Sequence, residues 1–143
     1  MYNSNFNLKP GDEIVLPKSN FQIINHHALY AGFDEKGVEW IIENNASSGV
    51  RLIQATQFFL NYPFIKTINR FKGSVVEREK LLRKALASVS KSYDVFFYNC
   101  EHFTSDMLTG RPASKQIENL KEGLQFAAGF TLFVGLLSIL FND

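Results

Sequence analysis

Hydrophobic and polar positions alternate along the first half of the chain, a pattern typical of β-strands. A turn at residues 9–12 precedes a short strand over 13–16 that ends at Pro17. A second strand is predicted over 23–32, where successive side chains lie on opposite faces. One face carries His26 together with Ile24, Ala28 and Tyr30, and the other carries His27 with Leu29 and Ala31.

Turn signals divide the rest of this half into further strands. The charged turn at 34–37 connects to a strand over 38–44, in which Ile41 and Glu43 share a face. A turn rich in Asn, Ser and Gly at 45–49 leads to a strand over 50–53. The aromatic stretch 58–71, which Pro63 interrupts, predicts one more strand at 64–70. The pattern therefore predicts a meander of antiparallel strands.

The second half changes to the period of an α-helix. Ser74 and Glu77 form a capping box that opens a helix ending near Ser92, with an apolar stripe that includes Leu81 and Ala85. The run 95–98 is aromatic and predicts an extended segment. A helix then begins at Cys100 with Asn99 as its N-cap and stops at Gly110, and Ser114 caps a last helix. The fold class is α+β, an antiparallel meander followed by helices.

Composition limits the alternatives. A chain of 143 residues fits one domain with a modest core. Its 15 Lys and Arg balance 14 Asp and Glu, so no nucleic-acid partner is indicated. A single cysteine excludes an intrachain disulfide and fits a reducing compartment. Residues 1–7 lack the basic-then-apolar order of a secretory signal, so the domain is expected on the cytoplasmic side.

Cys100 is the first candidate for chemistry. A thiol in the first turn of a helix lies among unpaired backbone N–H groups at the positive end of the helix dipole, and both stabilise the reactive thiolate. The alternative is a buried cysteine that acts only as a small hydrophobic residue. Three histidines and one cysteine do not have the spacing of metal ligands, and no glycine loop for phosphate is present, so neither a metal nor a cofactor is expected.

A cysteine nucleophile requires a base, and the base requires a polar group that orients it. His102 lies two positions after Cys100 on the same helix, so its side chain points away and is interpreted as a structural contact. His26 and His27 are adjacent on a strand, so only one of them can face a given helix. Glu43 lies on the next strand, where a cross-strand partner for a histidine is expected. Asn44 is the neighbouring alternative and faces the opposite way.

Three segments together resemble a known family. The turn Lys9-Pro10-Gly11-Asp12, the strand His26-His27-Ala28-Leu29-Tyr30-Ala31-Gly32 and the block Asn99-Cys100-Glu101-His102-Phe103 look like the lecithin:retinol acyltransferase-like domain. That family includes the H-Ras-like suppressor phospholipases. The resemblance runs from Lys9 past Arg111, and the cysteine block is its most specific part.

The resemblance implies a circularly permuted papain-like fold over residues 1–113, in which the histidine strand precedes the cysteine helix. It places the nucleophile at Cys100 and the base at His26, and the third polar position falls near Glu43. His27 stands where the family usually has an aromatic residue, so it is expected to face away and to pack or contact solvent. The implied reaction is acyl transfer or phospholipase A hydrolysis through a Cys100 thioester with a phospholipid ester. The alternatives are a cysteine peptidase or amidase on the same fold, and a catalytically idle membrane-associated scaffold.

The C-terminal region, 114–143, predicts a helix whose segment 124–141 has no formal charge. As a helix these 18 residues would extend about 27 Å, close to the apolar thickness of a bilayer. Lys115 and Lys121 precede the segment, as the positive-inside rule asks of a C-terminal tail anchor. The expectation is a membrane-associated protein with its domain on the cytoplasmic side. Burial of the segment in an oligomer is the alternative.

Overall fold

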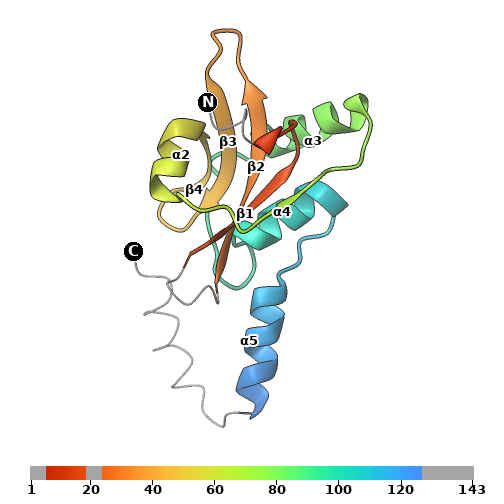
Figure 1. Cartoon of the computed structure of the whole chain (residues 1–143). Helices are drawn as coiled ribbons and strands as arrows, with labels where there is room; N and C mark the ends of the chain where they lie inside the picture. Colours follow the sequence, from red (N-terminus) through yellow and green to blue (C-terminus); the bar gives the residue numbers. More distant parts are fainter. Residues whose placement is uncertain (1–5, 19–23, 127–143) are drawn as a thin grey trace.

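The computed structural model of the chain describes residues 6–18 and 24–126. Within these residues the main elements are one antiparallel sheet and the four helices α2 to α5 (Figure 1). The sheet order is β4-β3-β2-β1-β5. The strands are β1 (Glu13–Pro17), β2 (Asn25–Phe33), β3 (Glu39–Asn45), β4 (Gly49–Gln54) and β5 (Thr67–Asn69). The helices are α2 (Ala55–Asn61), α3 (Val75–Ala87), α4 (Cys100–Thr109) and α5 (Lys115–Phe126). The α+β class predicted from the sequence is confirmed.

The sheet is the middle of three layers, with α2 on one face and α3 and α4 on the other (Figure 1). Each face has its own hydrophobic cluster, because side chains alternate along every strand. On the α2 face the cluster includes Ile14, Leu16, Ala28, Tyr30, Ile41, Phe58 and Phe59. On the α4 face it includes Leu29, Ile42, Val50, Leu81, Ala85, Phe103 and Met107. The strand β2 is the middle strand of the sheet, and both of its faces are covered. Because successive side chains alternate, His26 points into one layer and His27 into the other.

Two elements of the first half differ from the prediction. Residues 55–61 form the helix α2, which the sequence pattern does not predict and which overlaps the start of the aromatic stretch 58–71. It forms because Ala55, Phe58 and Phe59 bury one helical face against the sheet. The predicted strand at 64–70 shortens to β5, which returns to pair with β1 at the far edge. The sheet is therefore a four-stranded meander with one added strand.

The segment before Cys100 also differs from the prediction. The extended run predicted over 95–98 is a turn, because the Asp94 carboxylate accepts hydrogen bonds from the backbone N–H groups of Phe96 and Phe97 at 2.9 Å each. The helix expected to end near Ser92 ends at Ala87, with Ser88 as its C-cap.

The predicted helix starts are confirmed. Ser74 and Glu77 form the capping box of α3. Asn99 caps α4, its side chain accepting from the N–H groups of Glu101 and His102 at 3.0 Å each. Gly110 ends this helix in the left-handed conformation, with φ of 75°. The hydroxyl of Ser114 accepts from the backbone N–H of Ile117, as an N-cap of α5 should.

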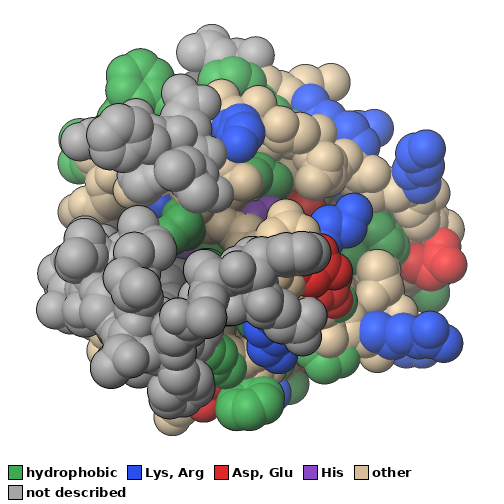
Figure 2. All heavy atoms as spheres, turned by 90° about the horizontal axis from the view of Figure 1, so that it is seen from below, with side chains coloured by type: hydrophobic (Ala, Val, Ile, Leu, Met, Phe, Trp, Pro, Cys, Tyr) green, Lys and Arg blue, Asp and Glu red, His purple; other side chains and the backbone are tan. Residues whose placement is uncertain are grey.

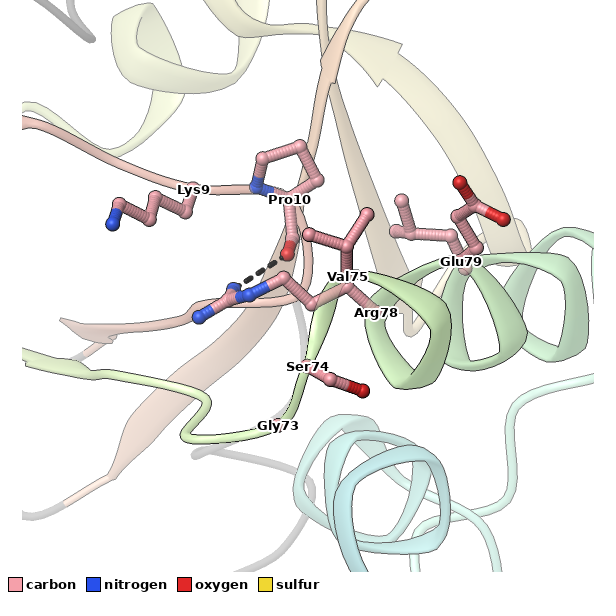
Figure 3. Close-up of a pocket in the computed structure, with 8 residues that line it drawn as sticks. Lys9, Pro10, Gly73, Ser74, Val75, Arg78 and Glu79 are labelled. Carbon is pink, nitrogen blue, oxygen red and sulfur yellow. Dashed lines mark hydrogen bonds between the residues drawn. The ribbon is translucent and has the colours of Figure 1, made fainter.

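The turn before β1 is held by a buried carboxylate. Asp12 accepts hydrogen bonds from the backbone N–H groups of Lys9 and Phe71 and forms ion pairs with Arg70 and Arg78 at 2.8 and 3.0 Å. Arg78 of α3 also donates to the Pro10 carbonyl at 2.7 Å, which joins the helix to the turn (Figure 3). The Pro-Gly-Asp turn is therefore a structural joint between β1, β5 and α3.

The predicted anchor, residues 124–141, lies outside the described residues except for its first three positions, which end α5. Within the described ranges 6–18 and 24–126, no helix combines the length and the apolar character needed to cross a bilayer.

Candidate active site

Cys100 is the first residue of α4, where the Asn99 cap begins the helix against the start of β2. The thiol is buried, with 6% of the residue exposed, and Sγ lies 3.9 Å from the Asn25 carbonyl oxygen. The cap occupies the N–H groups of Glu101 and His102, and the N–H of Phe103 donates to the Asn99 carbonyl. Among the described residues, the N–H of Cys100 has no such partner, so it is available beside the thiol.

His26 links this cysteine to a buried acid. Its Nε2 atom lies 2.5 Å from Oε2 of Glu43, and both side chains are buried. Glu43 is opposite Ala28 in the β2–β3 register, so His26 reaches it on the diagonal two residues away. The other ring nitrogen of His26 is left for Cys100, with which the imidazole also interacts.

Arg51 holds the far side of Glu43. It is directly opposite Glu43 in the β3–β4 register, and its Nε and Nη2 atoms lie 2.8 and 2.6 Å from Oε1. Two guanidinium N–H groups thus converge on one carboxylate oxygen and leave the other oxygen to His26. The site is therefore a chain of four side chains, Cys100, His26, Glu43 and Arg51, from the four elements α4, β2, β3 and β4.

Tyr62 covers the imidazole. Its ring stacks on that of His26 with centroids 4.7 Å apart and an interplanar angle of 17°, and Phe58 contributes a tilted contact at 6.1 Å. Both come from α2 and its C-cap. This cover limits rotation of the ring and reduces the access of water to the histidine.

The electrostatics favour a thiolate–imidazolium pair. Burial disfavours protonation of His26, but its contacts with Cys100 and Glu43 outweigh this and raise its pKa to about 9. Burial likewise opposes ionisation of Cys100, yet the hydrogen bond and positive charge of His26 lower the pKa of the thiol. For Glu43, burial is outweighed by His26 and Arg51, and the carboxyl pKa is lowered. Each of the three pKa shifts therefore favours the charged form of its group.

The other residues considered from the sequence have different positions. His102 accepts a hydrogen bond from the backbone N–H of Asn99, so its interpretation as a structural contact is confirmed. Asn44 faces the opposite layer and donates to the Tyr98 carbonyl at 2.6 Å, away from His26. His27 faces away from His26, as expected, but it is buried against Glu13.

The end of the molecule near the site carries exposed apolar side chains. Leu60 and Phe64 flank Tyr62 and Phe97 precedes Cys100, and they are 71%, 73% and 76% exposed. Seen from below, histidine atoms lie at the bottom of a hollow with hydrophobic side chains beside it (Figure 2).

A separate pocket of about 550 Å³ lies where α3 meets the turn before β1 (Figure 3). It is lined by Lys9, Pro10, Gly73, Ser74, Val75, Arg78, Glu79 and Leu82. Ser74 is occupied by its capping box and Arg78 by Asp12 and Pro10. The pocket contains none of the side chains of the Cys100 chain.

The structure brings together Cys100, His26 and Glu43, which the sequence singles out, and adds Arg51 and Tyr62, which it does not. Arg51 could have been found from the hairpin register: in a hairpin centred on the turn at 45–49, Glu43 and Arg51 are the same number of residues from the turn and lie opposite each other. Tyr62 is missed because the sequence pattern predicts no helix over 55–61, at whose C-cap this residue lies. No group of three or more potential metal ligands occurs within the described parts of the chain. The sequence matches no protein-family model, and a search among curated proteins found no match.

Proposed function

We propose that this protein is a thiol-dependent acyltransferase or phospholipase, in which Cys100 takes the acyl group of a phospholipid ester as a thioester. The observation that carries the proposal is the buried chain from Cys100 through His26 to Glu43, with 2.5 Å between the last two side chains. A nucleophile, a base and an acid that orients the base form the minimal set for covalent acyl transfer.

The steps follow from the positions of these groups. The Cys100 thiolate attacks the ester carbonyl, and the carbonyl oxygen becomes an oxyanion that the N–H of Cys100 can receive. Protonated His26 gives its proton to the departing alcohol as the carbon–oxygen bond breaks, which leaves the thioester. Neutral His26 then takes a proton from the acyl acceptor, which is water or another nucleophile. The acceptor attacks the thioester, the carbon–sulfur bond breaks, and the thiolate–imidazolium pair is restored.

The surroundings support an apolar acyl substrate. Leu60 and Phe64, two positions before and after the tyrosine that covers His26, are exposed hydrophobic residues, and so is Phe97 in the turn before Cys100. Exposed apolar groups near a site mark contact with an apolar ligand or surface. A peptide substrate would not explain these exposed apolar side chains, so we prefer a lipid-ester substrate to a peptide substrate.

The proposal extends to the family and the location. The histidine strand precedes the cysteine helix, and α4 packs on β2 and β3, which supports a circularly permuted papain-like domain of the lecithin:retinol acyltransferase-like type. The apolar segment 124–141 would hold this domain at a membrane surface on the cytoplasmic side. Helix α5, which leads to that segment, is joined to the site by Gln116, whose Oε1 accepts from the Asn25 N–H at 2.7 Å.

The test is intact mass after incubation with phosphatidylcholine vesicles. The expected result is a mass increase of one fatty acyl group in the full chain and none in Cys100→Ala. Free fatty acid should accumulate with the wild-type protein and fall strongly in His26→Gln. If the protein forms no acyl adduct and releases no free fatty acid, the proposed lipid reaction is overturned. Peptide amides cleaved in a Cys100-dependent way would then identify a peptidase, and no turnover of either substrate would favour a scaffold.

A further inference from the structure

A second histidine–carboxylate pair lies on the other face of β2. Nδ1 of His27 is 2.9 Å from Oε1 of Glu13, and both residues are buried. The remaining oxygen of Glu13 accepts from the Asn69 side-chain amide of β5 at 2.7 Å. Glu13 also interacts with the hydroxyl of Thr104, one turn after Cys100 on α4.

The two pairs have the same register relationship across neighbouring strands, although His26 uses Nε2 and His27 uses Nδ1. Glu43 is opposite Ala28 and bonds His26 two residues earlier on β2, while Glu13 is opposite Leu29 and bonds His27 two residues earlier. One strand therefore holds two neighbouring imidazoles, each oriented by a carboxylate from the strand beside it. They lie on opposite faces of the sheet.

Both imidazoles belong to the strand that the Cys100 sulfur contacts. The thiol of Cys100 contacts the backbone of β2 at Asn25, and the backbone N–H of His27 also interacts with it. The charged or titratable groups that face His27 are Glu13 from β1 and Cys100 and Glu101 from α4, and Asn69 and Thr104 complete the network through Glu13.

Packing alone does not account for this pair. Two ionisable side chains cost free energy to bury, and hydrophobic residues of similar volume would often stabilise the same layer equally well or better. The positive charge of protonated His27 also lowers the pKa of the Cys100 thiol. Glu13, Asn69 and Thr104 fix the imidazole and favour its protonated form, because the hydrogen bond to Glu13 opposes the effect of burial on the pKa of His27.

We propose that His27 is a second positioning histidine, which with Glu13 holds a positive charge beside Cys100 on the side of the sheet opposite to His26. This inference rests on the proposed function, because it assigns His27 to the stabilisation of the same thiolate. His27 acts through Cys100 and takes no proton from the substrate. The base remains His26, and two charges rather than one stabilise the nucleophile.

The test measures the pH dependence of alkylation of Cys100 by iodoacetamide, followed as intact mass. Cys100 is the only cysteine, so the readout reports one thiol and needs no substrate. The variants are His27→Gln, which removes the charge at similar size, and His27→Lys, which keeps it with a different shape. Glu13→Gln removes the acid that holds His27. His102→Gln is the matched control, because it removes another nearby histidine whose pKa burial lowers, so that it carries little charge at neutral pH.

The expected result is a rise in the midpoint of alkylation in His27→Gln and Glu13→Gln. At a pH below both midpoints, a rise of one half to one pH unit would slow alkylation by about threefold to tenfold. His27→Lys and His102→Gln should keep the wild-type midpoint. If His27→Gln does not fold, the contrast between Glu13→Gln and His27→Lys decides the question in the same way.

Three results would overturn the inference. These are an unchanged midpoint in both folded neutral variants, an equal rise in His27→Gln and His27→Lys, and an equal rise in His102→Gln. His26→Gln separates this failure from failure of the proposed function. If His26→Gln raises the midpoint while His27→Gln does not, only the second histidine is excluded. If His26→Gln has no effect on the midpoint, the proposed nucleophile itself is in question.

Discussion

Nε2 of His26 and Oε2 of Glu43 are 2.5 Å apart across two neighbouring strands, in a part of the sheet where both side chains are buried. A buried carboxylate without a partner would be strongly destabilising, so Glu43 must be compensated on both oxygens. His26 supplies one side and Arg51 supplies the other. The acid therefore fixes the ring of the histidine and favours the imidazolium.

Removal of this acid should weaken the nucleophile without removing it. Glu43→Gln keeps the size of the side chain but removes the charge that stabilises protonated His26, so hydrolysis should fall by about a hundredfold. Arg51→Gln leaves the carboxylate in place and should cost about threefold to tenfold, because the arginine is partly exposed. Initial rates with phosphatidylcholine vesicles measure both. Equal rates for wild type and Glu43→Gln would exclude Glu43 from this role.

The reactivity of Cys100 should extend to lower pH than that of an ordinary thiol. The pKa of Cys100 is lowered and that of His26 is raised to about 9, so the ion pair exists between the two values. Alkylation should therefore begin at a lower pH than that of a free thiol and then form a plateau. Loss of the His26 proton should then end the plateau near pH 9. A single transition at the pH of a free thiol would contradict the ion pair.

Much of the site could be predicted because it depends on short-range rules. Alternation along β2 assigns His26 and His27 to opposite faces. The tight turn at 34–37 brings Glu43 beside β2, and Asn99 marks the start of the cysteine helix. Each of these relationships is set by residues close in sequence or across one hairpin.

The rest depends on pairings that the sequence does not fix. The connection from Pro17 to Asn25 is longer than a tight hairpin loop, so no turn chemistry sets the β1–β2 register that brings Glu13 to His27. The helix α2 contains two phenylalanines that fit a strand equally well, and only burial of Phe58 and Phe59 against the sheet selects the helix. Tertiary packing decides both cases.

Asp12 should be a main source of stability. Its carboxylate is fully buried and paired with Arg70 and Arg78, so Asp12→Asn should lower the free energy of unfolding by about 3 kcal/mol. Urea denaturation measures this value, and Glu35→Gln on the same exposed hairpin as Asp34 is the control, with little change expected. A variant as stable as wild type would show that the joint contributes nothing.

The pH dependence of stability tests the same carboxylate. Burial opposes its ionisation, but hydrogen bonds from Arg70, Lys9, Arg78 and Phe71 outweigh burial and lower the pKa of Asp12. Its contribution to stability is therefore complete above its unfolded pKa of about 3.9 and is lost as the pH falls through the lower folded value. Asp12→Asn should flatten this part of the acid limb. An unchanged acid limb would assign acid sensitivity to other carboxylates.

Deletion of residues 127–143 should separate chemistry from membrane attachment. The deletion removes most of the predicted anchor but keeps α5 and its Gln116 contact with β2. The truncated protein should remain in the supernatant when membranes are sedimented, while Cys100 alkylates as in the full chain. The matched control replaces Leu60 and Phe64 by Ser in the full chain, which should still sediment. Sedimentation of the truncated protein with membranes would exclude the anchor.

Gly32 should be more sensitive to substitution than a glycine in the nearby hairpin. It has a φ of 95°, and a Cβ atom there would lie 3.0 Å from Cγ of Pro10. Gly37 has a φ of 76° but nothing within 4 Å of the corresponding position. Gly37→Ala therefore measures the backbone cost alone, about 1 kcal/mol, and Gly32→Ala adds a steric cost against a rigid ring, for about 3 kcal/mol in total. Thermal or urea unfolding measures both losses of stability. Equal losses in the two variants would show that Pro10 moves to accept the added Cβ atom, and that Gly32 is required only for its backbone conformation.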